Sequence, residues 1–152
     1  MMKRIVLFAF AALSAILICS CEKQDPEGLR MSCLPGEWEL YKYHHIYINT
    51  SGFIVDTTFL FTKDEKSVWT FKKDGTGVID NGNISIDRYL DFNWTEKDHV
   101  LTIDHPNPNY GCFSYQISYL VRKEMCLHYP TEGVTVWGGG PTDLYFRKVK
   151  NK

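Results

Sequence analysis

The residue types that most often carry catalysis or metal binding are present in this chain, but their spacing matches no reactive pattern. His44 and His45 are adjacent, and adjacent side chains of a strand point to opposite faces, so the pair cannot readily share one metal ion. His99, His105 and His128 are scattered and lack ligand spacing. No serine, cysteine or aspartate fits a nucleophile motif. The sequence therefore predicts no enzyme activity, no metal site and no cofactor.

One cysteine near the N-terminus, by contrast, follows a segment with a recognisable pattern. Lys3 and Arg4 precede an uncharged, mostly apolar run over residues 5–18, and Ile18-Cys19-Ser20-Cys21 is followed by polar residues. A positive start, a short apolar middle and a small residue before the cleavage point are typical of a secretion signal. The run has 14 residues, which is fewer than the ~20 residues of a membrane-spanning helix.

The end of this segment resembles the lipobox of bacterial lipoproteins, in which the cysteine after the cleavage point becomes the lipidated N-terminus. Cys21 fits this position, because Ser20 is small and Ile18 stands three residues before the cysteine. The resemblance implies a signal peptide over residues 1–20 and a lipidated tether over residues 21–33. Acyl chains would then hold the protein at the bacterial cell envelope, in the outer membrane. An uncleaved anchor, or secretion with cleavage elsewhere, would use the same pattern.

The remaining 132 residues are enough for one domain with a hydrophobic core. Without Lys3 and Arg4, 15 basic residues stand against 18 acidic residues, so the formal charge is −3. Charges of both signs are scattered without a basic stripe, which does not favour nucleic acid binding. Three further cysteines are Cys33, Cys112 and Cys126. In an oxidising compartment two of them could form a disulfide, or all three could be buried thiols.

From residue 36 onward, apolar and polar residues alternate in short runs separated by Gly, Pro, Asn and Asp clusters, which is typical of strands joined by tight turns. Asp74-Gly75 is the strongest hairpin signal, and outside the N-terminal run no segment has helical periodicity. One face of each strand is apolar, so we expect an antiparallel up-and-down barrel, with a sandwich as the alternative. The expected strands cover residues 36–49, 53–61, 67–73, 77–80, 88–95, 99–104, 110–121, 125–129, 134–137 and 144–149.

Four motifs, in this order, resemble those of bacterial lipocalin-like lipoproteins: Leu34-Pro35-Gly36-Glu37-Trp38, the hairpin over residues 69–77, Phe92-Asn93-Trp94 and Leu144-Tyr145-Phe146-Arg147-Lys148. The resemblance implies an all-β, lipocalin-like antiparallel barrel of about eight to ten strands over residues 34–152. It also implies that Trp38 closes one barrel end and that Arg147 packs over its indole. If Leu144 and Phe146 point inward, alternation turns Arg147 outward, so this contact needs a bulge or a strand end.

The barrel interior is the expected binding site. Eight-stranded barrels are either filled by their own side chains or hold one small ligand, and the sequence leaves both possibilities open. The run Gly138-Gly139-Gly140 is a flexible turn or a lid at the barrel mouth, and no Lys-Ser/Thr or helix follows it as in a phosphate loop. The candidate ligand-lining residues are large and apolar or aromatic: Phe59, Phe61, Trp69, Phe71, Phe92, Trp94, Tyr115, Ile117 and Tyr119.

We therefore expect a non-enzymatic envelope lipoprotein whose barrel binds or carries a small hydrophobic or amphipathic molecule. The alternative is a filled barrel that acts through its outer surface, as an accessory subunit or an adhesion module. The sequence identifies neither the ligand nor a protein partner. It also does not indicate which leaflet face the protein would occupy.

Overall fold

The computed structural model describes residues 29–83, 85, 87–130 and 140–150, and this part of the chain is almost entirely β-structure. A short 3₁₀ helix, η1 (Met31–Cys33), precedes nine strands. Within the described ranges no helix is long and apolar enough to cross a membrane. Cys21 and the expected strand at 134–137 lie outside these residues. The strands are β1 (Gly36–Ile48), β2 (Ile54–Leu60), β3 (Ser67–Phe71), β4 (Thr76–Asp80), β5 (Tyr89–Lys97), β6 (Val100–Asp104), β7 (Cys112–Leu120), β8 (Glu124–Tyr129) and β9 (Thr142–Lys148).

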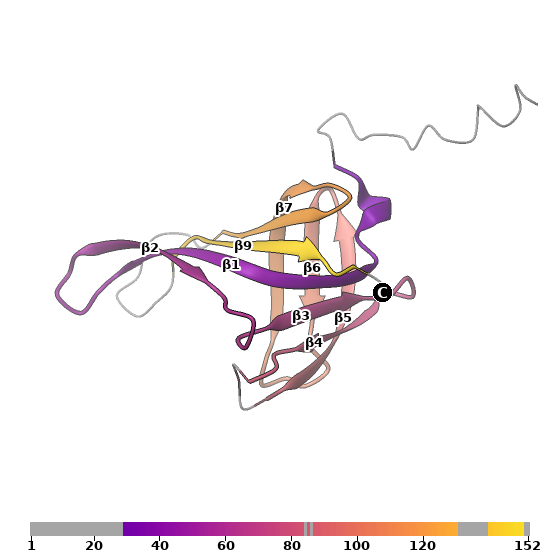
Figure 1. Cartoon of the computed structure of the whole chain (residues 1–152), viewed down its shortest axis with the longest axis horizontal. Helices are drawn as coiled ribbons and strands as arrows, with labels where there is room; N and C mark the ends of the chain where they lie inside the picture. The colour runs from indigo at the N-terminus through magenta and orange to yellow at the C-terminus, as the bar shows by residue number, and fades with distance from the viewer. Residues whose placement is uncertain (1–28, 84, 86, 131–139, 151–152) are drawn as a thin grey trace, which may run out of the picture.

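Eight of these strands close into an antiparallel barrel (Figure 1). From β3 to β9 each strand pairs with the next along the chain, and β9 pairs back with β1 to complete the ring. β1 is the longest strand, with 13 residues. Its first half pairs with β3 along one edge and residues 42–48 pair with β2 along the same edge, while residues 42–45 still pair with β9 along the other edge. The all-β, up-and-down barrel prediction is confirmed, and the sandwich alternative is wrong.

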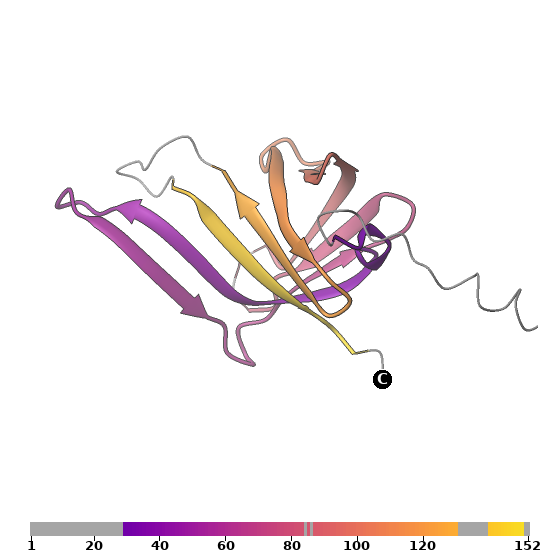
Figure 2. The same cartoon turned by 90° about the horizontal axis from the view of Figure 1, so that it is seen from above.

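Strand β2 stands outside the ring. It pairs with the second half of β1 in unbroken register, from Lys42–Leu60 to Ile48–Ile54, and Figures 1 and 2 show this hairpin projecting from the barrel. We call the hairpin over residues 42–60 the arm. Phe59 belongs to it and is 51% exposed, so the expectation that Phe59 lines the interior is wrong. Alternation alone does not distinguish a barrel strand from a strand added at its edge.

Large side chains fill most of the barrel. Trp69 packs edge-on against Phe146, with ring centroids 5.0 Å apart, and Phe71 packs in the same way on Phe92 at 5.3 Å. Gly77 of β4 lies opposite Phe92 of β5, and a Cβ atom on residue 77 would collide with the Phe92 ring. The small residue therefore makes room for the large one. The largest fully buried side chains among the described residues are Trp38, Phe71, Phe92, Phe146, Leu34, Leu101, Ile103, Leu120, Met125 and Leu127.

A β-bulge in β7 changes which side chains face inward. The register with β8 shifts between Ile117 and Tyr119, so that Ile117 and Leu120 are both buried in the core. Tyr119 is turned to the outer face, opposite Cys126 of β8. The expectation that Tyr119 lines the interior is therefore wrong, because a bulge adds one residue and inverts the alternation beyond it.

The residues before β1 cover one end of the barrel, which we call the closed end. Trp38 is fully buried there, and its Nε1 donates to the Leu34 carbonyl at 2.7 Å. Leu29 is buried, and Met31 packs against the core. The backbone N–H of Arg30 donates to the Leu120 carbonyl at 3.0 Å. Residues 29–33, which the sequence analysis assigns to the tether, thus form part of the packed domain.

The cation over the Trp38 indole is Lys148, and the expectation that Arg147 would take this place is wrong. The Lys148 Nζ lies 4.6 Å from the centroid of the Trp38 ring. Arg147 instead lies on the outer face, where it forms a two-pronged ion pair with Glu39 at 2.9 and 3.2 Å. Strict alternation around the buried Phe146 explains the exchange, since it turns residue 147 outward and residue 148 inward.

Candidate functional site

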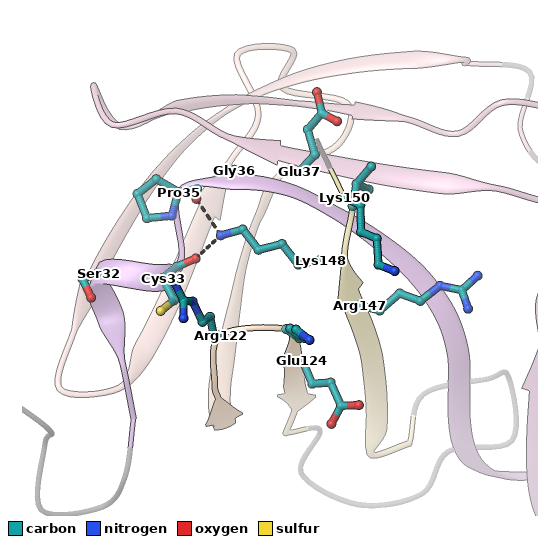
Figure 3. A pocket seen from close by; sticks show the side chains of 12 residues that line it. Ser32, Cys33, Pro35, Gly36, Glu37, Arg122, Glu124, Arg147, Lys148 and Lys150 are labelled. Carbon is teal, nitrogen blue, oxygen red and sulfur yellow. Dashed lines mark hydrogen bonds between the residues drawn. The ribbon is translucent and has the colours of Figure 1, made fainter. Parts of the chain in front are cut away.

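A hollow of about 670 Å³ lies outside the closed end (Figure 3). Lys148 reaches across it and donates from Nζ to the Cys33 carbonyl and, at 2.8 Å, to the Pro35 carbonyl. Burial lowers the pKa of Lys148. The other charged side chains of its wall come from the start of β1, from residues 122–124 between β7 and β8, and from the end of β9 and the residues after it: Glu37, Arg122, Lys123, Glu124, Arg147 and Lys150.

This closed-end hollow does not resemble a site for one enclosed molecule. Its one half-buried cation, Lys148, already has two carbonyl partners and the Trp38 ring. Arg122, Lys123 and Glu124 are exposed, and Arg147 is held by Glu39. Cations outnumber acids around the opening, so the surface suits diffuse attraction of anionic groups, which salt screens within ~8–10 Å.

A second hollow opens at the other end of the barrel, where β7, β8 and β9 meet. Its volume is about 170 Å³, and we call it the mouth hollow. Phe113 and Tyr115 come from alternate positions of β7, Tyr129 ends β8, and Thr142 and Leu144 begin β9. All five residues are partly buried, and they leave an opening to solvent above the filled core.

The aromatic walls of the mouth hollow are set by ring packing. Tyr115 and Tyr129 have ring centroids 5.6 Å apart, and Tyr129 meets Phe113 at 6.2 Å. Below them, Trp69 packs edge-on against Tyr115 at 6.1 Å and separates the hollow from the deeper core. Burial raises the pKa of Tyr115 to about 12, with a smaller contribution from Tyr129. The Tyr115 hydroxyl is therefore protonated at neutral pH and can donate a hydrogen bond.

Polar groups stand at the rim of the mouth hollow beside these rings. The Thr142 hydroxyl donates to the Gly140 carbonyl at 3.1 Å. A hydroxyl has one proton, so its oxygen accepts the 2.8 Å hydrogen bond from His45 Nδ1. The rim thus places the Thr142–His45 hydrogen bond next to aromatic surface.

A row of stacked rings continues from this rim along the arm. His45 stacks on Tyr43 at 5.6 Å and on Tyr47 at 5.4 Å, and Tyr43 stacks on Phe59 of β2 at 5.3 Å. Tyr43 and His45 pair with Leu144 and Thr142 in β9, so the row lies on the same face of the sheet as the mouth hollow. The aromatic surface is therefore larger than the hollow itself.

A chain of ionisable side chains crosses the outer face of the arm and barrel. His44 Nε2 lies 2.7 Å from Asp56 Oδ1 in β2, and His44 Nδ1 lies 3.4 Å from Asp143 Oδ2 in β9. The other oxygen of Asp143 is 2.7 Å from His128 Nδ1 in β8. Hydrogen bonding to Asp56, and then to Asp143, raises the pKa of His44. Among the described residues no group of His, Cys, Asp or Glu is arranged to hold a metal ion.

The structure brings together only part of the expected ligand-lining set. Tyr115 lines the mouth hollow. Phe61 and Trp94 are half-buried and pack against the core, and the Trp94 Nε1 donates to carbonyls of the β3–β4 turn at 3.1 Å. The remaining inward residues are buried in the core: Trp69, Phe71, Phe92 and Ile117.

Several residues of the mouth hollow were missed by the sequence analysis. Tyr129 follows Met125 and Leu127 at alternate positions, so the strand period could have found it. Thr142 and Leu144 come from the start of β9, next to a glycine run that obscures the strand boundary. His44 and His45 do point to opposite faces, as strand geometry predicts. Within the described part of the chain Cys33, Cys112 and Cys126 are free thiols.

No family model matches the chain, and no curated protein matches it. A lipocalin-like protein from Bacteroides uniformis is similar in structure, with 20% identity, a TM-score of 0.39 and coverage of 77% of this chain and 99% of that one. An uncharacterized protein from Bacteroides eggerthii has 17% identity, a TM-score of 0.38 and coverage of 76% and 98%.

The fold is lipocalin-like. This follows from the chain's own strand order and from the β1–β9 pairing that closes eight antiparallel strands into a ring. The lipocalin-like barrel differs from the expected version in two respects. Lys148 and not Arg147 lies over Trp38, and β2 adds an arm outside the ring.

Proposed function

We propose that this lipocalin-like barrel binds one small, flat, amphipathic molecule in the mouth hollow. The observation that carries the proposal is the hollow itself, which has aromatic walls on two sides and a Thr142–His45 hydrogen bond at its rim. Ligand sites combine apolar, aromatic walls with a few placed polar groups in the same way.

The size of the hollow limits the ligand class. Its 170 Å³ is below the ~300–1,000 Å³ of sites for drug-sized ligands, whereas a cavity of ~150 Å³ holds benzene. Trp69 blocks deeper entry. A single ring that carries a hydroxyl or a similar polar group fits the space and can meet the polar rim at Thr142 and His45. A long acyl chain does not fit.

The site can be tested by blocking it with one side chain. A panel of phenol and single-ring hydroxy-aromatic acids would be screened for a rise in melting temperature with ligand concentration, as binding to the folded state requires. Leu144→Trp should fill the hollow and abolish the shift. Ser114→Trp is the matched control, because Ser114 lies between Phe113 and Tyr115 in β7 but is exposed. A wild-type protein without any shift, or equal shifts in both variants, would reject the site.

As part of the same proposal, the protein is an envelope lipoprotein held by Cys21. Residues 29–33 lie at the closed end, so a tether that precedes them would leave from that end. The cations of the closed-end hollow would then face anionic headgroups, and the mouth hollow would face away from the bilayer. Cys21→Ala should abolish fatty-acid labelling and release the protein or leave its signal uncleaved. Normal labelling of this variant would refute the assignment.

The second candidate is an interaction module that acts through its outer surface. The filled core favours it, and so does the exposed apolar arm. In that case Leu144→Trp would leave the activity of the protein in its envelope unchanged, while substitutions on the arm would abolish it.

A further inference from the structure

Strand β2 has an unprotected edge. On one side it pairs with β1, and on the other side it meets no described strand. Natural edge strands are usually shortened, bulged or marked with Lys or Pro, because open backbone groups invite pairing with another chain. β2 has seven residues, Ile-Val-Asp-Thr-Thr-Phe-Leu, with no Lys, Arg or Pro and no register shift against β1. Most of its residues favour strands.

The same strand carries most of the exposed apolar surface. Seven large hydrophobic side chains are exposed in the described part of the chain, and four of them belong to β2 or directly precede it: Phe53 at 69%, Ile54 at 71%, Phe59 at 51% and Leu60 at 71%. At roughly 150–200 Å² for a large apolar side chain, these four expose about 400–500 Å². Alternation places Phe53 and Phe59 on the face of the aromatic row and Ile54 and Leu60 on the opposite face with Asp56, so apolar surface flanks the open edge on both faces.

We propose that β2 pairs with β2 of a second copy of this chain, antiparallel about a two-fold axis at Thr57. Pairing edge to edge would satisfy the backbone groups of the open edge and would bring the apolar side chains of one copy beside those of the other on each face of the sheet. The inference is independent of any ligand in the mouth hollow.

The sequence of β2 specifies this register. A two-fold axis places one residue opposite itself and pairs the others symmetrically. With Thr57 at the centre, Ile54 meets Leu60, Val55 meets Phe59, and Asp56 meets Thr58, so apolar residues meet apolar ones and the polar ones meet each other. A centre at residue 56 would oppose two aspartates, and a centre at residue 58 would set Asp56 against Leu60.

The backbone is in phase with this pairing. Phe61 N–H donates to the Tyr41 carbonyl, and Asn49 N–H donates to the Phe53 carbonyl. Hydrogen-bonded pairs alternate along an antiparallel ladder, so Val55, Thr57 and Phe59 bond to β1. The residues between them, 54, 56, 58 and 60, point their N–H and C=O groups to the open edge. These are the residues that the Thr57-centred register pairs through hydrogen bonds.

A second copy fits this surface better than a membrane does. The tip of the arm is the polar turn Asn49-Thr50-Ser51-Gly52, and residues 46–58 contain no Lys or Arg and one acid, Asp56. Anionic lipid surfaces attract cations and not such a segment. Leu60 is six residues beyond Ile54, or about 20 Å along the strand. The apolar residues therefore follow the strand instead of gathering at its tip.

Cysteine crosslinking in intact cells tests the register. The full chain would carry Cys112→Ser, to remove the exposed native thiol, together with Thr57→Cys. Two Thr57 positions in a non-hydrogen-bonded pair have Cα atoms ~4.5 Å apart, within the disulfide range of about 4.4–6.8 Å. Val55→Cys is the matched control on the same face, since its two copies would be about 13 Å apart along the strands.

We expect a reducible band of twice the monomer mass for Thr57→Cys and none for Val55→Cys. Equal bands, or no band for either variant, would overturn the register. In a separate experiment, sedimentation of the full chain in mild detergent should show a dimer. The double substitution Ile54→Lys with Leu60→Lys should convert this dimer to a monomer. Val121→Lys, at an exposed apolar residue far from β2, should remain dimeric. A wild-type monomer that binds phosphatidylethanolamine–phosphatidylglycerol vesicles through Phe53 would overturn the proposal in favour of a membrane.

Discussion

Replacing Lys148 with methionine should destabilise the protein much more than the same change at Arg147. Methionine keeps an unbranched apolar stem over the Trp38 ring and removes only the ammonium. The Lys148 Nζ donates to two carbonyls and lies 4.6 Å from the indole centroid. Arg147 has a single acidic partner, Glu39, and its side chain is 57% exposed.

The expected magnitudes follow from these contacts. A hydrogen bond to a charged group contributes about 1.5–3 kcal/mol, and a cation over an indole about 0.5–2 kcal/mol. Two effects reduce the sum. Burial already penalises the ammonium, as its lowered pKa shows, and the freed carbonyls border a hollow that water can enter. We therefore expect Lys148→Met to cost about 2–3 kcal/mol, and Arg147→Met about 0.2–1 kcal/mol, as for an exposed ion pair.

Urea unfolding followed by tryptophan fluorescence measures both values. With an unchanged m-value, Lys148→Met should lower the midpoint by on the order of 1–2 M. Trp38→Ala should cost about 3–5 kcal/mol. Its effect should be less than additive with that of Lys148→Met, because the two side chains touch, and additive with that of Arg147→Met. If Arg147→Met costs as much as Lys148→Met, or couples to Trp38, the assignment of Lys148 to the closed end is refuted.

Three further predictions concern the bulge, the outer face and the thiols. Ile117→Trp should overpack the core and cost about 1–3 kcal/mol, whereas Ser118→Trp, at the exposed bulge, should change the unfolding free energy by less than about 0.5 kcal/mol; similar costs in urea unfolding would contradict the bulge. The raised pKa of His44 means that its contribution to stability is complete below its ordinary value of 6.5 and is lost as the pH rises through the raised pKa. An NMR titration should show that Asp56→Asn lowers the His44 pKa more than Asp143→Asn does, and an equal or reversed effect would contradict the Asp56 contact. At pH 7.5 a maleimide should label exposed Cys112 quickly and Cys126 only on unfolding, because burial raises the Cys126 pKa to about 11; peptide mapping that finds rapid labelling at Cys126 would contradict its burial.

The sequence predicts the strands well because their period is local. The Asp74-Gly75 turn is an example: Gly75 adopts a φ of 85°, and the Asp74 carboxylate accepts from the Thr76 N–H at 3.0 Å. Each of these features depends on neighbours within a few residues. The place of Trp38 at the closed end is likewise predictable, because the motif around it resembles the start of the first strand in lipocalin-like proteins.

The sequence-based predictions are wrong where strand register or sheet topology decides which way a side chain points. Tyr119 faces outward because one extra residue at Ser118 inverts the alternation. Phe59 lies outside the barrel because β1 is long enough to pair with two different strands along one edge. The chain of His44, Asp56, Asp143 and His128 joins four strands, and no local spacing reveals it. The Arg147 error has another origin, since alternation already indicated that this residue points outward and the family resemblance indicated the opposite.

The length of β1 connects these features to function. A strand that ended at the barrel rim would leave the mouth hollow as a shallow cup, whereas the 13 residues of β1 place Tyr43 beside Leu144 and His45 beside Thr142 and carry Tyr47 past the rim. One face of this extension continues the aromatic wall of the hollow, and its paired strand β2 presents the open edge. Because the core below is filled, the chemistry available to a partner is concentrated at this end. A dimer formed through β2 would therefore set two mouth hollows on one continuous sheet, each beside its own row of stacked rings. Ile54→Lys with Leu60→Lys separates the two roles, since it removes the edge contact and leaves the hollow and its rim intact.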